Sequence, residues 1–167
     1  YQAEIFNGER LNDNLMEEVK KTKAFSFQIP QEYNGLALDY KTQSYIITKL
    51  ASYHPALSVV VMVPNSLGPG ELLVHYGTEE QKQKYLPKLA GGDYIPCFGL
   101  TGPHNGSDAL GKIDSGTVYR DSKTGSLKIK VHVNKRYITL APVSNLAGLA
   151  FQLNDPENLL QEGQEGI

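Results

Sequence analysis

Hydrophobic and polar positions recur at two different spacings along the chain. In the first half, apolar residues fall three and four positions apart, as they do along one face of an α-helix. After Gly91-Gly92-Asp93 the spacing changes, and residues 127–133 alternate apolar and polar at every step. That alternation is typical of a β-strand with one solvated face. The sequence therefore predicts an α+β fold, with a helical domain over residues 1–93 followed by an antiparallel β domain over residues 94–167.

Two helices are predicted before residue 55, with an extended stretch between them. Asn12 or Asp13 caps the first helix. Residues 25–29 alternate apolar and polar, which indicates a short extended segment that ends at Pro30. Residues 39–53 form the second helix. One side of this second helix is expected to carry Tyr45, Ile46, Lys49 and Leu50, with the Lys49 stem along its edge.

Two further helices are predicted from their caps. Asn65 and Ser66 either cap the start of a helix or lie in the loop before it. Thr78 is followed three positions later by Gln81, and this pair reads as a capping box at the start of another helix. Pro87 is expected to kink or end that last helix.

Several short strands are predicted in the second domain. Residues 117–119 and 127–133 are expected to pair as a hairpin, with a turn over 121–126. Further strands are predicted over residues 137–140 and 146–153.

Composition excludes several classes of protein. The 167 residues are 40% hydrophobic and 20% charged, as in ordinary soluble globular proteins of one domain or two small ones. The net charge of −2 argues against a nucleic-acid surface. The single Cys97 excludes an internal disulfide, and the histidines lack metal-ligand spacing, so no metal site is predicted. No apolar run reaches the roughly 18 residues of a membrane span. Because the chain starts at Tyr1 instead of Met, we expect it to be a piece of a longer protein.

The stretch with the clearest potential for chemistry covers residues 95–108. It begins as an apolar strand and becomes a polar loop near Pro103. Gly102 and Gly106 permit tight turns, and the loop offers backbone N–H groups beside the hydroxyls of Thr101 and Ser107. Such donors suit the carbonyls of a planar heterocycle or a phosphate. On residue types alone, a strand followed by an ordinary surface loop is the simpler interpretation.

This stretch, IPCFGLTGPHNGSD, resembles the flavin-binding strand and loop of the acyl-CoA dehydrogenases. Residues 134–139, NKRYIT, resemble that family's second flavin contact, an aromatic-Ile-Thr triplet after a basic residue. Residues 77–93 resemble the helix that precedes the flavin strand, and residues 62–73 are similar to the long bacterial members of fatty-acid oxidation. Three motifs in the family's order are far more specific than any one of them.

The resemblance implies a fold and a reaction. It implies a buried helix over residues 57–63, where the β-branched valines alone would favour a strand. It also implies FAD as the cofactor and acyl-CoA as the substrate, which loses its α proton and a β hydride to give trans-2-enoyl-CoA in fatty-acid β-oxidation. The electron acceptor would be an electron-transfer flavoprotein or another acceptor, and the whole protein would be a homo-oligomer. A cytoplasmic location is expected, with membrane association only through segments outside this chain.

The resemblance also assigns roles to individual residues. Tyr137 stands where smaller members often have tryptophan and would pack on the flavin ring, while Thr139 would lie near the reacting face. Ser107 would lie near both the diphosphate and the substrate. Without the resemblance, Tyr137 and Thr139 read as an ordinary half-buried strand pair. The predicted cofactor-binding residues are Phe98, Gly99, Leu100, Thr101, Gly106, Ser107, Tyr137, Ile138 and Thr139.

The chain departs from the family pattern at two places. Gly102 stands where the family usually has an acidic residue, and His104-Asn105 replaces a Gly-Ala pair. The family's general base is a glutamate of a C-terminal helical domain that these residues do not contain. Glu157, Glu162 and Glu165 match nothing in that motif, so no catalytic residue is assigned and the 167 residues alone are expected to be inactive.

Two other functions stay open from the sequence. A related flavoprotein oxidase would share these motifs and differ in how it uses oxygen. A homologue that has lost catalysis would keep the fold for assembly. A catalytic glutamate outside these residues would exclude the second of these alternatives.

Overall fold

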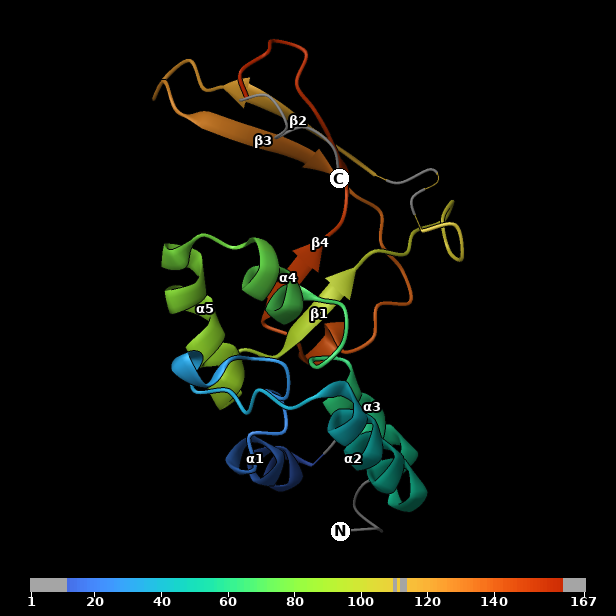
Figure 1. The fold of residues 1–167 in the computed structure, drawn as a ribbon. Helices are drawn as coiled ribbons and strands as arrows, with labels where there is room; N and C mark the ends of the chain where they lie inside the picture. The colour runs from blue at the N-terminus through green and yellow to red at the C-terminus, as the bar shows by residue number, and fades with distance from the viewer. Residues whose placement is uncertain (1–11, 110, 112–113, 161–167) are drawn as a thin grey trace. The chain divides into compact units, whose positions relative to one another are not determined.

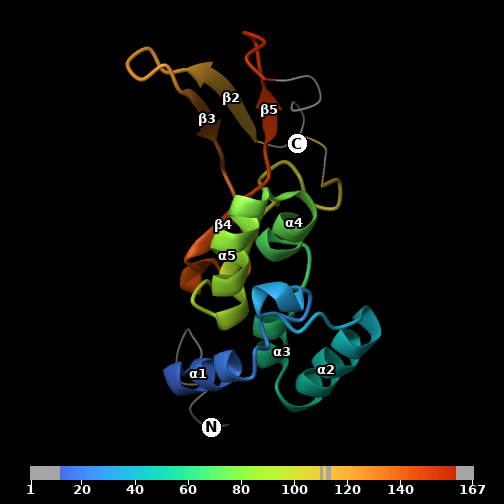
Figure 2. The ribbon, with the colours of Figure 1, turned by 60° about the vertical axis from the view of Figure 1, so that its left-hand side comes forward.

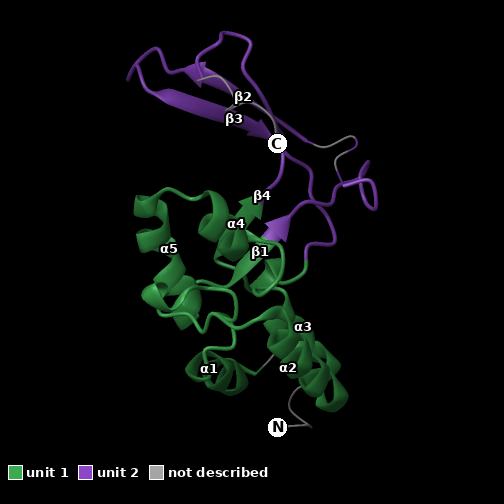
Figure 3. Ribbon diagram, in the orientation of Figure 1, with its two compact units in different colours: residues 1–97, 139–148 green, residues 98–138, 149–167 purple. Residues whose placement is uncertain are grey.

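The computed structural model describes residues 12–109, 111 and 114–160, and it contains two compact units (Figure 3). Unit 1 comprises residues 1–97 and 139–148, and unit 2 comprises residues 98–138 and 149–167. Unit 1 contains the helices and unit 2 contains a three-stranded sheet. The predicted order, helices first and strands afterwards, is confirmed.

The helices of unit 1 are short, and most begin at a polar cap. Asn12 accepts a hydrogen bond from the Asn14 N–H group at 2.8 Å, and Asp39 accepts one from Thr42 at 2.9 Å. No helix in the described part of the chain is long and apolar enough to cross a bilayer. The α-helices are α1 (Asp13–Lys21), α2 (Tyr40–Tyr53), α3 (Pro55–Met62), α4 (Pro69–Tyr76) and α5 (Glu79–Gly91), with 3-10 turns η1 (Gln31–Tyr33) and η2 (Ala141–Val143) (Figure 1).

Residues 55–62 are helical, as the family resemblance implied, although the valines alone favour a strand. Pro55 occupies the first turn of α3, where its missing N–H group costs no hydrogen bond. Helix α3 lies alongside α2 (Figure 2). Burial of Val60 and Val61 between neighbouring elements therefore outweighs the weak strand preference of valine.

The core of unit 1 has two hydrophobic clusters. One joins α1, α3 and the chain that follows α1, and the other joins α5 to the stretch around Ile29. The buried members of the first cluster are Val19, Ala24, Phe25, Phe27, Val60 and Val61, and those of the second are Ile29, Leu86, Leu89 and Ala90.

Residues 25–29 are not an extended segment, contrary to the alternation in the sequence. They form turns and bends in which Phe25, Phe27 and Ile29 are buried and Ser26 is buried as well. The Ser26 N–H group donates to the carbonyl of Lys23 at 3.0 Å, and the Ser26 carbonyl accepts from the Leu36 N–H group at 2.9 Å. A polar residue thus enters the core because local hydrogen bonds satisfy its backbone. Tyr45 also departs from its prediction, since it is exposed on α2.

Asn65 caps the end of α3, and neither Asn65 nor Ser66 caps the start of α4. The Asn65 side-chain amide donates to the carbonyls of Val61 at 2.8 Å and Ala24 at 2.6 Å, and its oxygen accepts from the Phe27 N–H group at 2.7 Å. The Val61 carbonyl belongs to the last turn of α3, where helical carbonyls lack partners. Helix α4 instead begins after Gly68 with Pro69 at its first position.

The capping box at the start of α5 is confirmed. The Thr78 hydroxyl accepts a hydrogen bond from the Gln81 N–H group at 3.2 Å, and the Gln81 side chain accepts one from the Thr78 N–H group at 2.9 Å. Pro87 lies inside α5, which continues to Gly91 and ends at Gly92 in a left-handed conformation, φ 77°. A Cβ atom at Gly92 would also meet the Lys20 side chain at 2.6 Å.

Replacing Thr78 with alanine is expected to destabilise the chain by about 1 kcal/mol, because the cap hydroxyl satisfies one backbone N–H group at the helix start. Urea denaturation followed by far-UV circular dichroism measures this change. Thr78→Ser keeps the hydroxyl and is the control, for which less than half of that loss is expected. Equal losses in the two variants would show that the hydroxyl is not what stabilises α5.

The strands of the second half form two sheets. Strand β2 is central in the three-stranded sheet, with β3 antiparallel on one side and β5 parallel on the other. Val118 of β2 is opposite Ile129 of β3, and the hairpin turn lies at 121–126 as predicted. The strands are β1 (Pro96–Gly99), β2 (Ser115–Arg120), β3 (Leu127–His132), β4 (Leu146–Leu149) and β5 (Gln152–Asn154), with β1 and β4 paired in the second sheet.

Two predicted strands differ from the structure. Residues 137–140 form no strand, because Tyr137 and Leu140 have positive φ angles of 61° and 66°, which break a pleated chain. Residues 146–153 form two strands, β4 and β5, which belong to different sheets. The parallel pairing of β5 with β2 is a local exception to the predicted antiparallel arrangement.

Candidate functional site

The loop after β1 folds back on itself at Gly102. The Gly102 N–H group donates to the carbonyl of Asn105 at 3.4 Å. A Cβ atom at Gly102 would approach the Asn105 side-chain oxygen and the Asn134 carbonyl, each to 2.9 Å. A larger residue at position 102, such as the acidic one of the family pattern, would therefore require the Asn134 backbone or the Asn105 side chain to shift. The side chain of Asn105, itself a departure from that pattern, is buried beside Gly102.

The carbonyl of Leu100 accepts two side-chain hydrogen bonds. Asn105 donates through its amide at 3.0 Å, and Lys135 donates through its ammonium at 3.0 Å. In a trans peptide the N–H group points opposite to the carbonyl, so these bonds turn the Thr101 N–H group away from Asn105 and Lys135. Among the described residues, no acceptor is found for that N–H group. Thr101 therefore presents a backbone donor of the kind that the sequence predicted for this loop.

The segment that carries the second motif lies directly beside this loop. The Arg136 N–H group donates to the Thr101 carbonyl at 3.2 Å, and the Arg136 guanidinium donates to the Pro103 carbonyl at 3.2 Å. These bonds join residues far apart in the sequence within unit 2. The two segments that resemble flavin contacts are thus neighbours in space.

A largely buried ion pair supports the same segment. The Lys135 ammonium lies 2.7 Å from the Asp114 carboxylate, and the two side chains are only 8% and 16% exposed. Asp114 also accepts from the Asn134 N–H group at 3.1 Å. Burial by itself raises the Asp114 pKa, but the Lys135 ammonium beside the carboxylate and the hydrogen bond from the Asn134 N–H group outweigh it and hold this pKa below its usual range. Asp114 is therefore ionised at neutral pH.

The other predicted flavin residues vary in exposure. Gly99 is buried in β1 and Phe98 is half-buried. Gly106 and Ser107 are exposed, and a Cβ atom at Gly106 would meet nothing within 4 Å, so space near this turn is open among the described atoms.

Along the sequence, the division between the two units falls within the aromatic-Ile-Thr triplet. The Tyr137 side chain is 86% exposed, and the Arg136 guanidinium lies 5.6 Å from its ring centroid. Ile138 is half-buried and belongs to unit 2, whereas the exposed Thr139 belongs to unit 1. Hydrogen bonds thus join the loop after β1 to residues 134–136 within unit 2. Thr139, the last residue of the triplet, belongs to unit 1.

The donors in unit 2 fit a flavin. The Thr101 N–H group and hydroxyl suit the carbonyl oxygens of a flavin ring, and the exposed Tyr137 ring offers a flat apolar surface. Sequence reasoning missed the support for these groups, namely Asn105, Asp114 and Lys135. Lys135 lies within the motif NKRYIT, but the basic residue directly before the triplet is Arg136. Nothing in the sequence marked Asp114 as a partner of Lys135.

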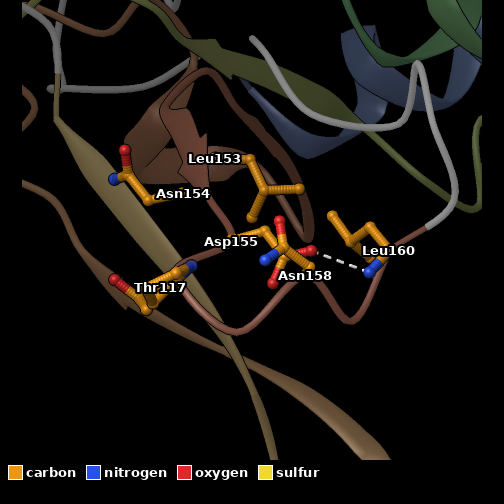
Figure 4. Close-up of a pocket in the computed structure, with 7 residues that line it drawn as sticks. Thr117, Leu153, Asn154, Asp155, Asn158 and Leu160 are labelled. Atoms are coloured by element: carbon orange, nitrogen blue, oxygen red, sulfur yellow. Dashed lines mark hydrogen bonds between the residues drawn. The ribbon is translucent and has the colours of Figure 1, made fainter.

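A cavity of about 730 Å³ lies elsewhere in unit 2 (Figure 4). Thr117 of β2 and Leu153 and Asn154 of β5 line it, and none of the predicted flavin residues does. Asp155 in its wall accepts a hydrogen bond from the Leu160 N–H group at 2.7 Å (Figure 4). Backbone N–H groups, chiefly that of Leu159, lower the Asp155 pKa. The Asp155 carboxylate thus supports the turn that ends at Leu160.

No group of three or more His, Cys, Asp or Glu side chains in the part of the chain that the structure describes is placed to hold a metal ion. Cys97 is buried, and the Ser144 hydroxyl lies 3.1 Å from its sulfur.

Known proteins similar to this chain agree with the resemblance. "Acyl-CoA dehydrogenase" of Bacillus subtilis is 29% identical over 153 residues, which are 92% of this chain and 37% of that protein. The bovine mitochondrial very long-chain specific acyl-CoA dehydrogenase is 37% identical over 101 residues, 60% of this chain and 15% of that protein. The crystal structure of acyl-CoA dehydrogenase complexed with FAD from Bacillus anthracis has a TM-score of 0.72 and 26% identity, covering 84% of this chain and 23% of that one.

The chain therefore spans little more than a third of one curated relative and less of the other. It covers the N-terminal domain of such proteins and part of their middle domain. The family model for the acyl-CoA dehydrogenase N-terminal domain matches residues 1–93, more than half of the chain. The chain belongs to the acyl-CoA dehydrogenase family.

Proposed function

We propose that the whole protein is an FAD-dependent acyl-CoA dehydrogenase that forms trans-2-enoyl-CoA in fatty-acid β-oxidation. Residues 1–93 supply part of its N-terminal helical domain. Residues 94–167 supply part of its middle β domain and one wall of its flavin site. The electron acceptor is then an electron-transfer flavoprotein or a carrier of similar chemistry, and the protein works as a homo-oligomer. FAD, when bound, supplies the hydride acceptor for the β carbon of the acyl thioester.

One observation carries the proposal. The Arg136 N–H group donates to the Thr101 carbonyl, so the two segments that resemble flavin contacts are joined within unit 2. Two motifs could match a family by chance along a sequence. Their direct contact through a backbone hydrogen bond is what a shared cofactor would require.

Each residue has a limited task in this proposal. Thr101 donates from its N–H group and hydroxyl to the polar edge of the flavin ring. Tyr137 packs its ring on the flavin, and Thr139 places a hydroxyl near the reacting face. Gly106 and Ser107 provide donors for the diphosphate, and Ser107 also contacts the substrate. Removal of the α proton needs a base, and no residue described here is assigned to that step.

The test is spectroscopic. The whole protein, purified with FAD, should show a flavin band that bleaches when an acyl-CoA such as palmitoyl-CoA is added. Reoxidation of the reduced protein in stopped flow should be slow with oxygen and fast with an electron carrier. Fast reoxidation by oxygen would identify an oxidase instead, and a whole protein that binds no FAD would refute the proposal.

Replacing Thr139 with valine is expected to slow flavin reduction in the whole protein about tenfold, because a hydroxyl near the reacting face is lost at nearly constant volume. Thr139 is exposed in the described chain, so the free energy of unfolding should change by less than about 0.5 kcal/mol. Thr117→Val in β2 makes the same chemical change away from the flavin motifs and is the control. Unchanged reduction kinetics in Thr139→Val would remove Thr139 from the proposed site.

A further inference from the structure

We propose that Lys135, held by Asp114, is a positioning residue that fixes the orientation of the Leu100–Thr101 peptide and so aims the Thr101 N–H group at the cofactor. The inference rests on the proposed flavin site and adds the two residues that set its geometry. Neither Lys135 nor Asp114 would touch the flavin in this arrangement, and both would act through the loop.

Two contacts fix the position of the Lys135 ammonium group. Its ammonium lies 2.7 Å from the Asp114 carboxylate and donates to the Leu100 carbonyl at 3.0 Å. The side chain is 8% exposed, and that of Asp114 is 16% exposed. A charge so little exposed requires its partners, because an unpaired buried ammonium loses its hydration without compensation. The lysine therefore cannot leave the Leu100 carbonyl at little cost.

The peptide plane transmits this constraint. The Leu100 carbonyl and the Thr101 N–H group belong to one planar trans unit, so fixing the first fixes the second. Asn105 also donates to the same carbonyl, at 3.0 Å, and would hold it weakly without Lys135 because a neutral donor gives a weaker bond than a charged one. The Thr101 carbonyl is held from the other side by the Arg136 N–H group at 3.2 Å. Lys135 and Arg136 are consecutive, so one short segment orients both carbonyls.

A second ion pair in unit 2 serves as the control for a purely stabilising role of Lys135. Lys128 and Asp121 form another Lys–Asp ion pair in unit 2, at the hairpin turn, with Lys128 46% exposed. That pair makes no contact with the flavin loop among the described residues. Lys128→Met therefore removes a more exposed Lys–Asp ion pair of the same unit without disturbing the Leu100–Thr101 peptide.

Two measurements on the whole protein test the inference. Lys135→Met should raise the FAD dissociation constant at least about tenfold, since the charged hydrogen bond to Leu100 is lost. Without any flavin present, it should also speed amide hydrogen exchange in residues 100–106 by a similar factor. Lys128→Met should leave both quantities unchanged. Asp114→Asn keeps the shape of the partner and should give a smaller change in the same direction.

The outcomes separate the inference from the function on which it rests. Lower thermal stability in Lys135→Met with unchanged exchange and FAD affinity would overturn the positioning role. If Lys135→Met does not fold, Asp114→Asn decides the same question, and unchanged values there would overturn it. If the unaltered protein binds no FAD, the proposed function fails, while the exchange measurement still decides whether Lys135 orients the peptide.

Discussion

Replacing Asn65 with alanine is expected to lower the free energy of unfolding by about 3–5 kcal/mol. The side chain is buried and makes three hydrogen bonds to backbone groups, each between 2.6 and 2.8 Å. Its loss leaves the Phe27 N–H group and the carbonyls of Ala24 and Val61 without that partner, and each unsatisfied buried group costs about 1–3 kcal/mol. The effect is large because one side chain joins the end of α3 to the chain that follows α1.

Urea denaturation of the Asn65→Ala chain measures this loss. Ser66→Ala is the matched control, since the exposed Ser66 hydroxyl donates to the Val63 carbonyl at 3.0 Å and to no other group in the described residues. We expect the control to change stability by less than about 0.5 kcal/mol. A loss below about 1 kcal/mol in Asn65→Ala would mean that water or local movement replaces the hydrogen bonds.

The difference between Thr78 and Asn65 shows which features the sequence could reveal. Thr78 and Gln81 are three residues apart, and their capping box depends only on local backbone geometry. Local reasoning placed Asn65 either in a loop or at the cap of a helix start. Its partners Phe27 and Ala24 are 38 and 41 residues away, and no local pattern indicates contacts at that distance.

Positive φ angles limited the prediction of strands in a similar way. Neither Tyr137 nor Leu140 is a residue type that favours turns, yet both adopt left-handed conformations, which are incompatible with a strand. Such conformations are imposed by the surrounding structure, because bulky residues avoid them in isolation. The alternation over residues 127–133, by contrast, predicted the strand β3 correctly because a two-residue period is a local property. The expectation of a single solvated face was wrong, since all of Leu127–His132 is exposed, including Ile129 and Val131.

The candidate site was predicted through motifs and not through its supporting contacts. Residues such as Thr101 and Tyr137 were found because their order resembles a known family. The ion pair between Asp114 and Lys135 joins residues on either side of the β2–β3 hairpin. The bond from Lys135 to Leu100 spans 35 residues. Sequence position alone gives no reason to connect them.

The 167 residues by themselves are expected neither to retain FAD nor to oxidise acyl-CoA. Tyr137, the proposed partner of the flavin ring, is 86% exposed, and Ser107 and Thr139 are exposed as well. A ring held on one side by such residues stays largely in water, so little apolar area is buried to offset the cost of association. The chemical step should fail for a separate reason, because the family resemblance places the general base outside these residues.

The test mixes the purified 167-residue chain with excess FAD, removes unbound flavin by dialysis, and records the visible spectrum before and after palmitoyl-CoA is added. The whole protein, treated identically, is the control and should keep a stoichiometric flavin band that bleaches with substrate. We expect the short chain to lose essentially all of its flavin, even when circular dichroism shows that its helices are formed. A stoichiometric band that bleaches in the short chain would show that these residues contain a complete site. In that case the proton acceptor would have to be sought among their own carboxylates.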